Sequence, residues 1–400
     1  MAVRDGATAP LSRGGRADWL PFHLPSIGEE EIAEVVDTLR SGWVTTGAKT
    51  QRLERDLAER LGVPSVLALA SGTAALHLAL RVCGVQPGDH VVVPTYTFTA
   101  TAEVVTYLGA RPILADVDPV TCNVTAEHLE RVLTRRTRAV MPVHIAGLPC
   151  DMDPIVSLAR ARGLAVIEDG AHALPASYRG RKIGSIGDAT AFSFYATKNV
   201  TTGEGGALTL ADPARMDEAR ILALHGISRD AWKRYSAAGT WRYEVLESGY
   251  KYNLSDLASS LGIHQLRKLD GFHARRLALV ARYHAGLRDL GAVTVPPTLP
   301  DTEHAWHLYL LRLRPETLSI DRDQFIEELR ARNIGTSVHF IPLHLHPYYQ
   351  RAWGYRPGDF AGAETAFAST VSLPLYPAMR DADVDDVVEA VWDIARRFQR

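Results

Sequence analysis

The sequence predicts an α/β fold, in which a large domain with a mainly parallel sheet is followed by a smaller α+β domain. Short apolar runs alternate with helical stretches up to about residue 210, a long helical stretch follows Asp256, and a shorter strand and helix pattern follows Pro296. Near-continuous apolar runs are typical of parallel strands that helices cover on both faces. A chain of 400 residues with 46% hydrophobic content is long enough for these two domains.

The expected elements follow this order. A capping box over residues 26–29 opens a first helix, whose apolar face is Ile32, Val35, Val36 and Leu39. Strands of the large domain are expected at residues 66–70, 90–93, 112–115, 139–143, 164–167, 190–194 and 207–210. The small domain is expected to contain a strand at 307–313, a helix at 321–332, a strand at 336–340 and a final amphipathic helix through Val384, Val387, Val388, Val391, Ile394 and Phe398.

We expect a disordered tail over residues 1–18, a large domain over 19–270 and a small domain over 271–400, with the long helix as the bridge. The tail is rich in glycine, arginine and small residues, and it lacks the apolar region of a signal peptide. The sequence therefore predicts that the folded part of the chain begins near Trp19.

Composition excludes several classes of partner. A formal net charge of -2 provides no basic field for nucleic acid or a membrane surface. The three cysteines, Cys83, Cys122 and Cys150, are an odd number without metal-ligand spacing, so no metal is expected. Free thiols are typical of a reducing compartment, and a cytoplasmic protein fits best.

The strongest chemical signal is Lys198, which follows an apolar strand and precedes the turn Gly203-Glu204-Gly205-Gly206. A partly desolvated amine beside cationic or phosphate groups can act as a nucleophile and condense with an aldehyde. A single lysine is more often a surface residue. The interpretation therefore depends on what accompanies it.

A phosphate seat is expected where a strand turns through Ser71-Gly72-Thr73 directly into a helix. Free amides and the positive end of the helix dipole favour an anion there, and the hydroxyl of Thr73 adds a donor. Ser193, five residues before Lys198, can donate to the same phosphate. By itself this pattern is also that of an ordinary helix N-cap.

Asp169 ends another apolar strand, in the segment Glu168-Asp169-Gly170-Ala171-His172. A carboxylate at the bottom of a cofactor cleft can pair with a pyridine nitrogen and keep it protonated, although an isolated strand-end aspartate more often caps a helix. His172 can hydrogen-bond a ring hydroxyl or stack near it, or it can be a satisfied polar residue. Phe98, just past a further strand, can stack on the ring or pack in the core.

Together, an anion seat, a strand-end aspartate and a strand-end lysine indicate pyridoxal phosphate. Their segments resemble those of the sugar-nucleotide aminotransferases of the DegT/StrS group, which have the aspartate-aminotransferase-like fold of pyridoxal-phosphate fold type I. The resemblance runs from about residue 20 to the C-terminus. Besides the segments above, it rests on Ser41-Gly42-Trp43-Val44-Thr45-Thr46-Gly47, Gly249-Tyr250-Lys251-Tyr252-Asn253-Leu254-Ser255-Asp256 and Val338-His339-Phe340.

Within this group the sequence most resembles the 4-aminotransferases of the UDP-4-amino-4-deoxy-L-arabinose type. The shared stretches are His225-Gly226, Tyr250-Lys251-Tyr252-Asn253 and Ser372-Leu373-Pro374-Leu375. This chain has Ser-Gly-Thr where those relatives tend to have Ser-Ala-Thr, and Phe98 where they often have Trp. These departures leave the sugar open and do not affect the chemistry.

The resemblance also implies partners and further contacts. It implies a homodimer with shared active sites, in which Asn253 contacts the phosphate bound by the partner chain. Thr46 and His339 are expected to border the substrate. His344, in the following loop, is a further substrate-binding candidate or an ordinary loop histidine.

The expected reaction is a ping-pong transamination. Lys198 holds the cofactor, is displaced by L-glutamate, and then moves the proton between the two reacting carbons. The amino group is then transferred to a ketone of a nucleotide-linked sugar, and this ketone is expected at C4. Transamination of a cyclitol ketone is an alternative, and a non-catalytic regulatory member of the fold is another. A related dehydratase is disfavoured, because those enzymes carry His at the position of Lys198.

Overall fold

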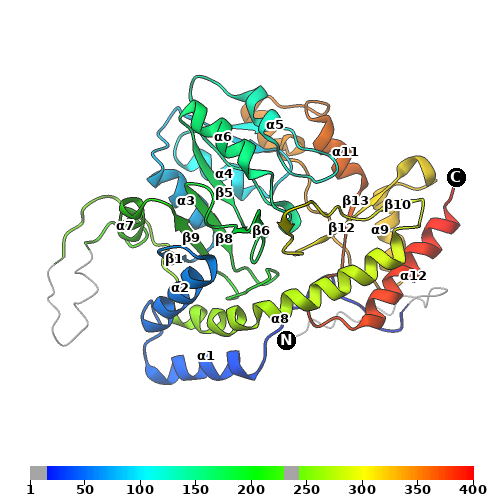
Figure 1. The fold of residues 1–400 in the computed structure, drawn as a ribbon, viewed down its shortest axis with the longest axis horizontal. Coiled ribbons are helices and arrows are strands. Elements are labelled where there is room, and N and C mark those ends of the chain that lie inside the picture. The colour runs from blue at the N-terminus through cyan, green and yellow to red at the C-terminus, as the bar shows by residue number, and fades with distance from the viewer. Residues whose placement is uncertain (1–15, 229–242) are drawn as a thin grey trace.

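The computed structural model describes residues 16–228 and 243–400. A seven-stranded sheet, with the strand order β1-β9-β8-β5-β4-β2-β3, forms the centre of the large domain (Figure 1). Its strands are β1 (Val66–Leu69), β2 (His90–Pro94), β3 (Arg111–Ala115), β4 (Thr137–Val140), β5 (Ala165–Asp169), β8 (Ala189–Ser193) and β9 (Gly206–Leu210). The bounds of each strand lie within three residues of those that the sequence predicts.

The sheet is mainly parallel, as the apolar runs predict. Strands β3, β2, β4, β5 and β8 pair in parallel, whereas β9 is antiparallel to both β8 and β1. The carboxyl ends of β1, β2, β5 and β8 therefore lie at one edge of the sheet. Ligands of open α/β sheets bind at this edge, outside the strand ends.

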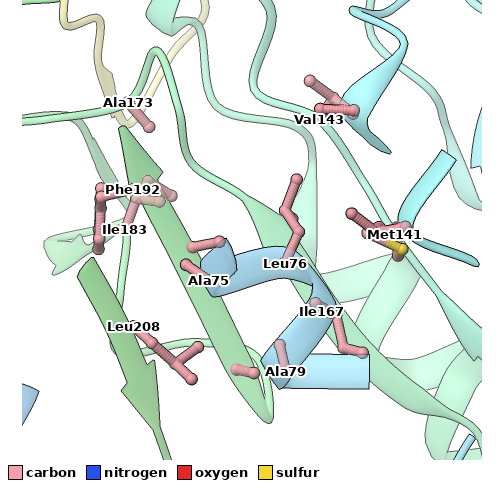
Figure 2. Packing of buried hydrophobic residues seen from close by; sticks show 14 of the residues in the cluster. Ala75, Leu76, Ala79, Met141, Val143, Ile167, Ala173, Ile183, Phe192 and Leu208 are labelled. Atoms are coloured by element: carbon pink, nitrogen blue, oxygen red, sulfur yellow. The ribbon is translucent and has the colours of Figure 1, made fainter. Parts of the chain in front are cut away.

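Helices on both faces bury the sheet. They include α3 (Gly72–Val82), α4 (Ala100–Tyr107), α5 (Ala126–Val132), α6 (Met152–Arg162) and α7 (Pro213–Leu222). Figure 2 shows Ala75, Leu76 and Ala79 of α3 against the strands that carry Phe192 and Leu208. Full burial of a side chain such as Leu208 stabilises the fold by about 1.5–3 kcal/mol. This packing fixes the N-terminus of α3 at the ligand edge.

The long helix α8 (Asp256–Leu287) connects two hydrophobic cores. It packs against α1 (Glu29–Ser41) and α2 (Ala48–Leu61) at one end and against α12 (Asp381–Arg397) at the other (Figure 1). Leu269 belongs to the core of the large domain and Leu279 to that of the small domain. The division that we propose near residue 270 falls inside this helix, and the chain also crosses between the cores elsewhere, since Leu20 packs in the small core.

The small domain is built on a three-stranded sheet with the order β10-β12-β13. Its elements are β10 (Val293–Thr294), β12 (Tyr309–Leu313), β13 (Thr370–Leu373), α9 (Arg322–Ala331), α10 (Pro347–Trp353), α11 (Ala361–Ser369) and α12. A second three-stranded ribbon joins β6 (Ser177–Tyr178) and β7 (Arg181–Lys182) to β11 (Thr302–Glu303).

Two local expectations about secondary structure are wrong. Residues 336–340 form no strand, because only Ser337 pairs, in a single bridge with Ser372 of β13. The N-cap of α1 is Gly28, whose N–H donates to the Glu31 side chain over 2.9 Å, so Ser26 does not form the predicted capping box.

The apolar face predicted for α1 is largely uncovered in the single chain. Ile32 is 48% exposed and Leu39 is 55% exposed, while Glu31 and Thr38 of the same helix are buried. Glu31 is buried because it meets Lys268 and Gln265 of α8. The polar face of α1 thus packs inside the chain and part of its apolar face lies outside.

The predicted tail needs a correction at its C-terminal end. Most of it, residues 1–15, lies outside the described residues. Arg16, however, forms an ion pair with Asp383 at 2.9 Å, so this residue packs on the small domain. Among the described helices, none has the length and apolar character needed to cross a bilayer.

Candidate active site

A cavity of about 350 Å³ opens at the carboxyl edge of the large sheet. It brings together eight residues that the sequence predicts for the site, from four strand ends and the small domain. These are Gly72, Thr73, Phe98, Asp169, His172, Ser193, Lys198 and His339. Convergence of residues so far apart in sequence on one cavity supports a single site.

Two glycines lie at the anion seat. Gly206 pairs with Leu69 of β1 on one side and with Ser193 of β8 on the other. A Cβ at Gly206 would lie 2.5 Å from the carbonyl carbon of Ser71, and a Cβ at Gly72 would lie 3.1 Å from the Cβ of Ser193. At Gly206 only glycine allows this approach, whereas a Cβ at Gly72 would be tolerated if Ser193 shifted by a few tenths of an ångström. The first turn of α3 and the Ser193 side chain are thereby held together.

Asp169 is the last residue of β5 and is 5% exposed. Burial raises the pKa of this carboxyl, and the Thr101 hydroxyl, the Ala171 amide and Lys198 oppose that shift. Thr101 donates to Oδ2 over 2.8 Å, and the Ala171 amide donates to Oδ1 over 3.1 Å. Thr97 supports Thr101 through a 2.8 Å contact between hydroxyls. The carboxyl is thus fixed in orientation at the cavity wall.

Lys198 lines the same cavity, in the turn that follows β8. Burial lowers the pKa of its amine to about 8, and the charge of Asp169 opposes this shift. An amine with a pKa near 8 is partly neutral at physiological pH, as a nucleophile must be. The position and protonation of Lys198 therefore suit condensation with an aldehyde.

Aromatic and imidazole rings form the remaining walls. Phe98 is 58% exposed, which excludes core packing as its role in the single chain. Its ring lies 6.0 Å from that of Phe340, which in turn stacks on His172 at 5.8 Å. His339 contacts Ser372 Oγ through Nδ1 over 2.8 Å, and burial lowers its pKa to about 4.

The other wall residues are not among those predicted individually as site residues. They are Ser71, Leu76, Thr97, Ala100, Val143, Ala171, Tyr195, Thr197, Glu204, Gly205, His307 and Phe340. Several stand inside motifs that the sequence marks, and proximity to those motifs is the signal that identifies Tyr195 and Phe340. His307 stands in no such motif, and only the tertiary structure brings it to the cavity.

Three predicted residues lie outside this cavity. Thr46 and Asn253 line a second cavity of about 440 Å³, and Asn253 Nδ2 donates to Thr46 Oγ1 over 2.7 Å. His344 is fully buried between Thr95 and Glu364, at 2.8 and 2.9 Å, and does not line the first cavity. The prediction that His344 binds substrate is therefore corrected: it connects the loop after β2 to α11.

Comparison with known proteins identifies the family. The model of the DegT/DnrJ/EryC1/StrS aminotransferase family matches residues 25–392. The chain belongs to this family. It is 49% identical over 382 residues to the spore coat polysaccharide biosynthesis protein SpsC of Bacillus subtilis, covering 95% of this chain and 98% of that protein.

Solved structures agree with this assignment. The putative sugar aminotransferase Spr1654 from Streptococcus pneumoniae, in its PMP form, superposes with a TM-score of 0.88 at 36% identity, covering 95% of this chain and 98% of that one. PseC of Helicobacter pylori, an aminotransferase of pseudoaminic acid biosynthesis, reaches a TM-score of 0.89 at 25% identity, covering 95% and 100%. The predictions of fold type I and of a pyridoxal-phosphate-dependent aminotransferase are confirmed.

The described residues fit this cofactor. The glycine-shaped seat at the N-terminus of α3 suits a phosphate, Lys198 suits the aldehyde, and buried Asp169 suits a protonated pyridine nitrogen. The exposed ring of Phe98 is free to stack on a flat ligand.

Buried histidines predict an acid-sensitive fold. Burial lowers the pKa of His77 to about 4 and that of His304 to about 3, from an ordinary value of 6.5. Between pH 6.5 and these values the unfolded chain binds more protons than the folded one, so stability falls as pH falls. Each histidine should lower the free energy of unfolding by about 1–2 kcal/mol as the pH falls from 6.5 to 5. Thermal unfolding midpoints at these two pH values would measure the effect, and equal midpoints would contradict it.

Proposed function

We propose that this aminotransferase moves an amino group from L-glutamate to a keto group, at C4, of a nucleotide-linked sugar. The observation that carries the proposal is the cavity that joins Lys198, Asp169 and the anion seat. Further support comes from relatives, since SpsC is a protein of spore coat polysaccharide biosynthesis and Spr1654 is described as a sugar aminotransferase. An amino sugar for a surface polysaccharide is the corresponding product.

Each predicted site residue has its own role in this reaction. Bound pyridoxal phosphate supplies an electrophilic carbon and an electron-poor ring. Gly72, Thr73 and Ser193 hold its phosphate, and Asp169 keeps the ring nitrogen protonated. With the amino donor in the site, the amine of Lys198 would take a proton from one reacting carbon and return it to the other. Phe98 and His339 line the same cavity, where Phe98 would stack on the cofactor ring and His339 would border the sugar.

Absorption spectroscopy tests the proposal directly. Purified protein loaded with pyridoxal phosphate is treated with L-glutamate, and then with a panel of UDP-, dTDP- and GDP-linked 4-keto sugars. Loss of the visible band with glutamate, and its return with one keto sugar, would establish donor and acceptor together. Return of the band with free inosose alone would indicate the cyclitol reaction instead. A protein that binds the cofactor but responds to no donor would indicate a regulatory member.

We also infer a homodimer with shared active sites. The half-exposed Ile32 and Leu39 of α1 provide an apolar surface that a second copy would cover. The Nδ2 of Asn253, in the wall of the second cavity, carries two N–H donors, and the one that Thr46 does not use suits an anion held by another chain. We infer that the reaction takes place in the cytoplasm, in line with the three free cysteines.

Mixing two inactive variants tests the shared site. In a heterodimer of Lys198→Ala and Asn253→Ala, one site would combine an intact Lys198 with an intact Asn253. Random reassociation should then restore about a quarter of the wild-type activity, because half of the dimers carry one intact site of two. The two parent variants, each reassociated with itself, are the controls. No recovery, with heterodimers shown by mass spectrometry, would refute the shared site.

A further inference from the structure

His307 lies in the cavity wall beside His172, and the reaction described above gives it no role. Its side chain is buried, and the centroids of the two imidazole rings are 4.5 Å apart, with an interplanar angle of 43°. Each neutral imidazole has one nitrogen that donates and one that accepts. The surrounding hydrogen bonds determine which is which.

Asn199 determines which ring nitrogen of His307 carries the proton. Asn199 Nδ2 lies 2.9 Å from the carbonyl oxygens of both Leu174 and Ala305 and donates to both. The flipped amide would place its oxygen against two acceptors, so Oδ1 must face His307 Nδ1, at 3.3 Å. Since an amide oxygen only accepts, Nδ1 of His307 donates, and its Nε2 keeps a lone pair.

His172 has the opposite arrangement. The backbone N–H of Ala146 donates to His172 Nδ1 over 3.2 Å, which leaves the proton on Nε2. Burial lowers the pKa of both His172 and His307 well below the usual value, so both rings are neutral. Neither Nε2 has a partner among the described residues, and neither is sealed from the cavity. The wall therefore presents one donor and one acceptor side by side.

We propose that His307 determines sugar specificity, with its Nε2 accepting a hydrogen bond from a hydroxyl group of the acceptor sugar; this rests on the proposed function. A lone pair repels a carboxylate, which only accepts, so this position does not hold the carboxylates of the amino donor. A sugar hydroxyl can donate its proton there. The neighbouring Nε2–H of His172 remains for an acceptor such as the ring hydroxyl of the cofactor.

Two amide substitutions separate the two nitrogens of His307. Asparagine places its amide near the position of Nδ1 and can still pair with Asn199, but it has no acceptor at the cavity. Glutamine reaches the position of Nε2 and can present its amide oxygen there. His307→Asn should raise KM for the keto sugar about 3- to 10-fold, the usual range for one lost hydrogen bond, and His307→Gln should raise it less. His346→Gln is the matched control, because the partly exposed His346 side chain lines no part of this cavity.

The measurement compares two half-reactions and a set of deoxy sugars. Supporting results are a larger change in the sugar half-reaction than in the glutamate half-reaction, and one deoxy analogue on which wild type and His307→Asn perform equally. Equal slowing of both half-reactions, or the same response of every deoxy analogue, would mean that His307 only supports the fold, and would overturn the proposal. Failure of the proposed function would be distinct, because wild type itself would then respond to no keto sugar.

Discussion

Replacing Lys198 with alanine is expected to lower kcat by at least about 10³-fold, because one amine serves as both nucleophile and proton carrier. The anion seat and Asp169 remain, so pyridoxal phosphate should still bind. Borohydride reduction followed by peptide mapping should find the cofactor attached to Lys198 in the wild type and to no residue in Lys198→Ala.

Lys182→Ala is the matched control for this substitution. Lys182 pairs with Glu303 over 2.9 Å and does not line the active-site cavity. Its variant should keep both activity and the covalent trap at Lys198. Wild-type turnover in Lys198→Ala would refute the assignment of the cofactor lysine. In the wild-type apoprotein, the rate of covalent attachment should rise with pH through about 8, where Lys198 loses its proton.

Asp169→Asn is expected to lower kcat by about 10²- to 10⁴-fold while leaving the fold intact. An amide has the shape of the carboxyl but no negative charge, so it cannot keep the pyridine nitrogen protonated. The cofactor ring would then withdraw electrons less strongly. Kinetics and the absorption spectrum of the bound cofactor, compared between wild type and variant across pH, would measure the change.

Thr101→Val provides a graded comparison. It removes the 2.8 Å hydrogen bond to Asp169 but keeps the charge, so a smaller loss of about tenfold is expected. A larger effect for Thr101→Val than for Asp169→Asn, or wild-type activity in the latter, would contradict the role given to the carboxylate.

The sequence alone determined the fold class and most of the site. Apolar runs predict buried parallel strands whatever surrounds them, and the carboxyl ends of such strands must meet at one edge. The convergence of residues at or just after these strand ends, such as Asp169 and Lys198, can therefore be predicted without knowledge of the packing. Their chemical character then indicates the cofactor.

Tertiary structure decided the remainder, because these features depend on neighbours distant in sequence. Residues 336–340 have the composition of a strand, but only Ser337 pairs, in an isolated bridge with Ser372 of β13. His344 is buried, with hydrogen bonds to Thr95 and Glu364. His307 reaches the cavity because its backbone N–H donates to the carbonyl oxygen of Ala146 over 3.0 Å, and its tautomer is set by Asn199, 108 positions away. Such long-range contacts leave no local periodicity in the sequence.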